Sequence, residues 1–186
     1  MLRPLLAATA MQAALPSTPG SPSRHVDASS PGNAAMRLTD YTDYAFRVLI
    51  YLGMRPDRLV TIREIATAYG ISKNHLMKVV HFLGLVDLVH TVRGRTGGIR
   101  LGGKPAEIRL GSVVRLTEPD FHIVECFDAA RNRCVLSPDC ELKHALACAR
   151  AAYLERLDQV SLADLLQEQA TSPAYAPPGT AAPLST

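Results

Sequence analysis

The chain has 186 residues, of which 47% are hydrophobic and 20% charged, and its formal net charge is +3 at pH 7. This composition is typical of a globular protein, and no apolar run approaches the ~18–20 residues of a membrane-spanning helix, so no membrane partner is predicted. The charge is uneven, because residues 61–109 contain eight Lys and Arg against three Asp and Glu, whereas residues 116–160 contain five against eight. A basic half beside a mildly acidic half indicates a polyanion-binding module joined to a second functional part.

Both ends of the chain differ in composition from its middle. Residues 16–35, PSTPGSPSRHVDASSPGNAA, are rich in Pro, Ser and Gly, which predicts a disordered N-terminal extension over residues 1–35. Residues 1–15 loosely resemble a signal peptide, and a start site that the cell does not use is another interpretation of the same segment. A second disordered tail is expected over residues 169–186, so the folded part is predicted to span residues 36–168.

Two helices are predicted at the start of the folded part. The first begins after Thr39, a plausible N-cap residue, and stops at Gly53. The second is expected between Thr61, which has the capping-box spacing with Glu64, and Gly70. Apolar side chains at helical spacing are expected to face the core: Leu38, Tyr41, Ala45, Val48 and Leu52 in the first helix, and Ile62, Ile65 and Ala66 in the second.

A third helix is predicted between Ser72, as its N-cap, and Gly84. Its expected core-facing residues are Leu76, Val79, Val80 and Leu83. Because a turn of only about four residues separates it from the second helix, the two together predict a helix-turn-helix.

The next segment, LVDLVHTVRGRTGGIRLGG, predicts a β-hairpin. Residues alternate along both strands, and RGRTGG forms the turn between them; the alternating positions are Val86, Leu88, His90 and Val92, then Ile99 and Leu101. A helix-turn-helix followed directly by such a hairpin is a winged helix, expected here over residues 36–110. The predicted fold class is therefore mainly α with a small β-hairpin.

The third helix and the hairpin tip carry the candidate DNA contacts. The helix places polar and basic side chains away from the predicted core, and a helix-turn-helix lays this helix in the major groove. The hairpin tip could reach the adjacent minor groove, whose negative potential attracts Arg. A plain solvated basic face is the alternative. The candidate DNA-binding residues are Ser72, Lys73, Asn74, His75, Lys78, Arg93 and Arg95, and His81 also points outward.

All four cysteines lie within the segment from Val124 to Cys148. Cys126, Cys134 and Cys140 are separated by seven and five residues, and the paired ligands two to four residues apart that typify zinc sites do not occur. Such wide, irregular spacing on a polar loop indicates an iron–sulfur cluster, whose iron is held by thiolates, although inert thiols or a zinc site remain alternatives. Cys148 would lie about 12 Å along a helix from Cys140, so it is expected to be a buried small apolar residue instead.

A long helix is predicted from about His144 to Leu166, since this stretch lacks Pro and Gly and has apolar residues at helical spacing. A helix this long on so small a domain is expected to pack against a second copy of the chain, with packing back on its own domain as the alternative. Residues 111–168 are thus predicted to contain a cluster loop and a dimerisation helix.

Four motifs occur together and in order: MRLTDYTDYAFRVLIYL, ISKNHLMKVVHFL, RGRTGGIRL and VECFDAARNRC followed by PDC. Over residues 36–160 the chain resembles the NsrR-like nitric-oxide-sensing repressors, winged-helix iron–sulfur regulators related to IscR. The gap between the first two cysteines is longer than this family's pattern, and the N-terminal extension is foreign to it.

The resemblance implies a cytoplasmic homodimer that represses transcription from a palindromic double-stranded DNA operator until nitric oxide attacks its cluster. It also implies an iron–sulfur cluster, 4Fe-4S rather than 2Fe-2S, on Cys126, Cys134 and Cys140. The fourth ligand it implies is Asp43 of the partner subunit, with His144 as the rival and a simple ion pair between Asp43 and Arg47 as the alternative role.

Three other functions are weighed against this one. An IscR-like regulator responding to cluster supply or redox state would use the same scaffold, and a zinc-stabilised DNA-binding protein would have no sensing role. An enzyme is not predicted, because the sequence contains no nucleophile motif, phosphate loop or paired-carboxylate motif, and GGIRLGG is typical of a turn.

Overall fold

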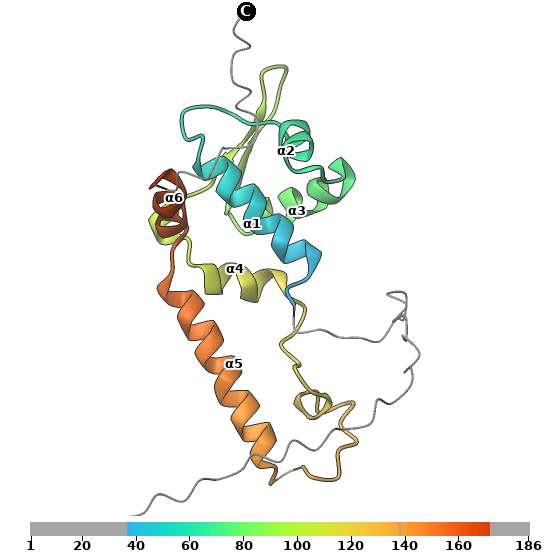
Figure 1. Ribbon diagram of the computed structural model, residues 1–186. Coiled ribbons are helices and arrows are strands. Elements are labelled where there is room, and N and C mark those ends of the chain that lie inside the picture. The colour runs from blue at the N-terminus through green and yellow to red at the C-terminus, as the bar shows by residue number, and fades with distance from the viewer. Residues whose placement is uncertain (1–36, 138, 172–186) are drawn as a thin grey trace, which may run out of the picture. The chain divides into compact units, whose positions relative to one another are not determined.

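The computed structural model describes residues 37–137 and 139–171, which form six α-helices, two short 3-10 helices and one hairpin (Figure 1). The elements in chain order are α1 Asp40–Gly53, α2 Ile62–Tyr69, α3 Lys73–Leu85, β1 Val89–Val92, β2 Gly98–Leu101, η1 Pro105–Glu107, α4 Leu110–Thr117, η2 Glu125–Phe127, α5 Glu141–Gln159 and α6 Leu162–Thr171. The expected disordered segments, residues 1–35 and 169–186, lie outside the described residues except for residues 169–171, which end α6. Within the described ranges, none of the helices is both long and apolar enough to cross a membrane.

Helix α1 begins at its predicted cap. The hydroxyl of Thr39 accepts a hydrogen bond from the amide of Thr42 at 3.3 Å, which satisfies one of the free N–H groups of the first turn. The helix buries Ala45, Val48, Leu49 and Leu52. Leu38 was expected to face the core, but it precedes the helix and is exposed.

Helices α2 and α3 form the predicted helix-turn-helix. The hydroxyl of Thr61 caps α2 by accepting from the amide of Glu64 at 3.1 Å, and Gly70 ends the helix with φ +65°, a left-handed conformation that glycine adopts without strain. Helix α3 follows Ser72, whose side chain makes no capping bond. All four residues expected to be buried are buried: Leu76, Val79, Val80 and Leu83.

The predicted hairpin is confirmed. Val89 and Ile99 are buried, whereas His90 is exposed. Asp87, which has φ 59°, turns the chain between the end of α3 and β1. Val89 then pairs with Leu101, and the two face the core together.

The predicted long helix is two helices, because the chain turns at Ser161. The Ser161 hydroxyl accepts from the amide of Asp164 at 3.2 Å, and the Asp164 carboxylate accepts from the amide of Ser161 at 2.8 Å, which is a reciprocal capping box. The backbone on either side of Ser161 pairs with residues 108–110, so α5 ends at Gln159. Ser161-x-x-Asp164 was a readable signal for a helix start.

Helix α6 packs on α1 and η1, whereas α5 packs mainly on α4. A Cβ built on Gly53 of α1 would lie 2.6 Å from Leu166 of α6, so glycine allows the two helices to approach closely. Leu162 of α6 is fully buried in the same core as α1 and α3. Helix α5 contacts α4 and has no buried residue among its 19, and Figure 1 shows it extending beyond α4.

Candidate DNA interface and cysteine segment

The recognition helix α3 presents one apolar and one polar side. The side opposite its four buried residues carries every residue predicted there, all exposed: Ser72, Lys73, Asn74, His75, Lys78 and His81. Lys and Asn side chains offer donors for phosphates and for base edges in the major groove. Met77 is also 42% exposed, and sequence reasoning missed it. An exposed thioether between two donors can make apolar contact with a thymine methyl group.

Helix α1 contacts the start of the recognition helix through an aromatic pair. The ring of Tyr44 stacks on the imidazole of His75 with a centroid separation of 6.5 Å and an interplanar angle of 21°. This contact limits the orientations that the exposed His75 side chain can take. The sequence did not predict a role for Tyr44 in the DNA interface, because its stacking partner His75 lies 31 residues further along the chain.

The wing places its two arginines at the hairpin tip. Arg93 and Arg95 are exposed on either side of Gly94, whose φ of +121° permits the turn. Val60, just before α2, pairs with Ile99 of β2 through two backbone hydrogen bonds of 2.8 and 3.0 Å, which joins the wing to the helix-turn-helix. The outer side of the wing adds a further basic residue, Arg100, which is exposed opposite His90.

The cysteine segment is the irregular loop that the sequence predicts. Cys126 is half-buried in η2, Cys134 is exposed, and Cys140 is half-buried as the N-cap of α5; all four cysteines are free thiols. Arg150 of α5 fixes the first part of the loop, since its guanidinium lies 4.7 Å from the ring centroid of Phe127. The residue that follows Cys126 is thereby in contact with α5.

The candidate ligands do not come together within one chain. Among the described residues, no group of three or more His, Cys, Asp and Glu side chains is close enough to hold a metal ion. Asp43 instead forms an ion pair with Arg47 at 2.9 Å, the alternative role considered from the sequence. The donor set still suits an iron–sulfur cluster chemically, because it consists of three unpaired thiols on a polar loop.

The prediction for Cys148 was wrong in one respect. Cys148 is exposed, because α5 buries nothing in this chain, and its Sγ lies 3.8 Å from Nε2 of His144. Helix α5 begins at Glu141 with Cys140 as its N-cap, which is earlier than the predicted start at about His144 and agrees with the helical placement assumed for Cys148. Eight residues of helix therefore separate Cys148 from Cys140, about 12 Å along the axis.

The cysteine loop begins at a polar junction between α4 and α1. Glu118, the C-cap of α4, accepts hydrogen bonds from the amide and the hydroxyl of Thr39, at 2.8 and 3.1 Å. The buried hydroxyl of Thr42 donates to that of Thr117 at 2.9 Å. The start of the cysteine loop is thus bonded directly to the first turn of α1, which carries Asp43.

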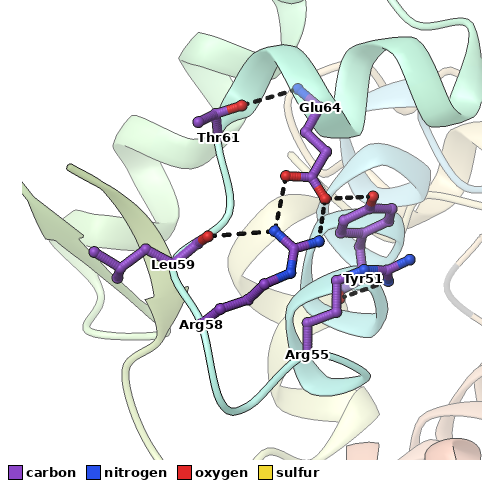
Figure 2. Close-up of polar contacts among 6 residues, drawn as sticks. All are labelled: Tyr51, Arg55, Arg58, Leu59, Thr61 and Glu64. Atoms are coloured by element: carbon purple, nitrogen blue, oxygen red, sulfur yellow. Dashed lines mark hydrogen bonds and ion pairs between the residues drawn. The ribbon is translucent and has the colours of Figure 1, made fainter. Parts of the chain in front are cut away.

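A second polar cluster fixes the turn between α1 and α2 (Figure 2). The carboxylate of Glu64 accepts from both terminal nitrogens of Arg58, one of them at 3.0 Å, and from the hydroxyl of Tyr51 at 2.9 Å. The hydrogen bonds from Arg58 are the main reason why the pKa of Glu64 falls from 4.5 to about 2. Arg55 lies over the other side of this cluster, with its guanidinium carbon 3.7 Å from the Tyr51 ring centroid.

A basic recognition helix, an arginine-tipped wing and a loop with three free thiols define a winged-helix DNA-binding regulator with a cysteine-rich segment. The chain belongs to the Rrf2 family, whose model is described as an iron-dependent transcriptional regulator and matches residues 38–168.

Individual relatives agree with this assignment. The chain is 57% identical over 135 residues to the HTH-type transcriptional regulator NsrR of Bacillus subtilis (strain 168), covering 72% of this chain and 92% of that protein. It is 54% identical over 135 residues to the NsrR of Bacillus licheniformis, covering 72% and 94%.

Two solved structures share the fold. CymR, the global cysteine regulator of B. subtilis, is 26% identical with a TM-score of 0.60, covering 72% of this chain and 98% of that chain. T. potens IscR is 22% identical with a TM-score of 0.60, covering 74% and 93%. The comparisons confirm the predicted fold class and the prediction of a transcriptional regulator rather than an enzyme.

Proposed function

We propose that the chain is a cytoplasmic, homodimeric repressor that binds a palindromic DNA operator and releases it when nitric oxide attacks an iron–sulfur cluster. The observation that carries the proposal is the position of three free thiols on a loop bonded at its start to the DNA-binding head. The 57% identity to an NsrR regulator supports the same function. Free thiols on the surface also suit a reducing compartment such as the cytoplasm.

The DNA contacts of this repressor come from the recognition helix and the wing. We assign the major-groove contacts to the exposed residues of α3 and the minor-groove contacts to the arginines of the hairpin tip: Ser72, Lys73, Asn74, His75, Lys78, Arg93 and Arg95. Their exposure and the ring contact between Tyr44 and His75 support this assignment.

The second copy of the chain is expected along α5. This helix buries no residue within its own chain, and it exposes Leu142 to 64% and Tyr153 to 38%. A 19-residue helix with exposed apolar side chains gains stability by packing against another copy. Two recognition helices then bind two half-sites of a palindrome about one DNA turn, ~34 Å, apart.

Cys126, Cys134 and Cys140 are the ligands proposed for the cluster, 4Fe-4S in preference to 2Fe-2S. When bound, the cluster would supply iron that reacts with nitric oxide. Asp43 of the partner subunit is the proposed fourth ligand, and oxygen binds cluster iron less strongly than thiolate does. His144 is the rival, since it is exposed one helical turn after Cys140.

An IscR-like response to cluster supply or redox state is the second candidate function. The fold similarity to T. potens IscR accommodates it. The two functions predict different triggers for DNA release.

Zinc in place of the cluster would give a colourless protein, whereas an iron–sulfur protein is brown.

The deciding experiment titrates nitric oxide without oxygen into cluster-loaded protein bound to an operator selected from random duplexes. Absorbance near ~400 nm and DNA occupancy are recorded together. We expect both to fall in step, and Asp43→Ala to shift the dose that releases DNA while His144→Ala leaves it unchanged. A cluster that reacts while the protein stays on DNA contradicts the proposed switch, and release by cluster loss alone favours the second function.

A further inference from the structure

Met77 is an apolar residue on the outward side of the recognition helix. It is 42% exposed, whereas Leu76 beside it in the sequence is fully buried. Residues three and four apart are neighbours on a helix surface, so Lys73 and Asn74 adjoin Met77 one turn before it. His81 adjoins it one turn after it, and all three neighbours are exposed. Met77 is therefore an apolar point within a polar and basic surface.

The position of Met77 along α3 is suited to a base contact. The helix begins at Lys73, four residues before Met77, and the N-terminal residues of the second helix of a helix-turn-helix contact base edges. Helical side chains lean toward the N-terminus of their helix, so the side chain of Met77 leans toward Lys73 and Asn74. It is thereby placed to meet a base edge when the helix enters the major groove.

The thioether of Met77 restricts the group that it can contact in the groove. A methionine side chain has no hydrogen-bond donor, and its sulfur is only a weak acceptor, so it matches neither a phosphate nor the polar edge of a purine. The apolar group that distinguishes one base from the others in the major groove is the C5-methyl group of thymine. An unbranched, polarisable side chain adapts its shape to such a group. Thymine is therefore the base that Met77 fits.

We propose that Met77 determines part of the operator sequence by packing against the C5-methyl group of one thymine in each half-site. The inference rests on the proposed DNA-binding function and adds to it one residue and the base that this residue selects. The contact is apolar and involves no phosphate, so its loss should weaken specific binding without changing the salt dependence of binding.

The test uses the full, cluster-loaded protein and an operator selected from random duplexes, with binding measured by fluorescence anisotropy. Deoxyuridine replaces each thymine in turn, together with its equivalent in the other half-site, which removes only the methyl group. At one position the wild type should bind about fourfold more weakly per half-site, or about fifteenfold for both, as the loss of one buried methyl group in each requires. Met77→Ala should bind the thymine and deoxyuridine operators equally at that position, with an unchanged salt slope.

Two variants serve as controls. Met77→Leu keeps an apolar side chain of similar volume, so it should still discriminate against deoxyuridine. Leu85→Ala removes a side chain that is 69% exposed at the last residue of α3, about 12 Å further along the helix axis, and it should discriminate as the wild type does. Comparing both operators in both proteins isolates the contact from any effect of the methyl group on DNA shape.

The outcomes separate the possible failures. A wild-type protein that binds no duplex contradicts the proposed DNA-binding function itself. A wild type that binds a selected operator overturns the contact alone if its half-sites contain no thymine, if no methyl group matters, or if Met77→Ala keeps the methyl dependence. Loss of discrimination in Leu85→Ala, or a reduced salt slope in Met77→Ala, also overturns it, because discrimination would then depend on the placement of the whole helix.

Discussion

Glu64 is expected to stabilise the fold by about 1–2 kcal/mol at neutral pH, and Glu64→Gln removes this contribution while keeping a side chain of the same size. The pKa of Glu64 drops from 4.5 to about 2, and each unit corresponds to about 1.4 kcal/mol. The full shift would give about 3.4 kcal/mol. The Arg58 side chain is 50% exposed and the Glu64 side chain is 31% exposed. Solvent therefore screens the interaction, and the expected stabilisation is smaller than the full shift would give.

The pH dependence has a definite sign. Because the folded-state pKa of Glu64 lies below its unfolded value, the stabilisation is fully present above pH 4.5 and is lost as the pH falls toward 2. The difference in unfolding free energy between wild type and Glu64→Gln should therefore be constant from pH 7 to about 5.5 and shrink below pH 4.5.

Urea denaturation of both proteins, followed by circular dichroism at each pH, measures this difference. Both are compared in the metal-free form, so that acid loss of a cluster cannot enter the result. Lys104→Gln is the control. The Lys104 side chain is 82% exposed and that of its ion-pair partner Glu107 is 66% exposed, so this pair should contribute little to the unfolding free energy. Equal stability of wild type and Glu64→Gln at pH 7, or a difference that grows toward low pH, would refute the reasoning.

Three further predictions concern the wing, the thiols and the α1–α4 junction. Replacing Arg93 and Arg95 together with Ala should weaken DNA binding by about 1–3 kcal/mol and flatten its salt dependence, and unchanged gel shifts across a salt series would remove the wing from the interface. Substituting Ala for any of the three loop cysteines should give a colourless protein, while Cys148→Ala stays coloured; a colourless Cys148→Ala would show that the loop rearranges. Thr42→Val, which removes the buried bond to Thr117, should lower the unfolding free energy by about 1 kcal/mol in urea.

The winged helix could be predicted because its signals are local. The caps at Thr39 and Thr61, the glycine at position 70 and the apolar spacing of α3 each act within a few residues. The sequence did not predict the side of each strand that faces the core, because the chain enters β1 through one residue, Asp87, in a left-handed conformation. Nothing in the adjacent alternation indicates where such a residue lies, and a shift of one residue reverses the sides of a strand.

The end of α5 was missed for a different reason. Apolar spacing continues through Ser161, so periodicity alone extends the helix, yet the backbone there pairs with residues 108–110, about fifty positions earlier. The capping box of Ser161 and Asp164 was the local sign of the break. The exposure of Cys148 follows from the same architecture, because a helix that leaves the core cannot bury its own residues.

The junction at Glu118 gives a physical basis for an intersubunit fourth ligand in the proposed switch. Glu118 accepts two hydrogen bonds from Thr39, so the start of the cysteine loop and the first turn of α1 are joined in one unit. Within that unit, Asp43 pairs with Arg47, and the described residues include no ligand cluster. If the three thiols of one chain instead recruit Asp43 of the partner subunit, the weak ion pair between Asp43 and Arg47, worth ~0.3–0.5 kcal/mol, must break. A bond across the dimer would then fix the separation of the two recognition helices, and its loss would release the operator while leaving sequence-independent attraction to phosphate intact.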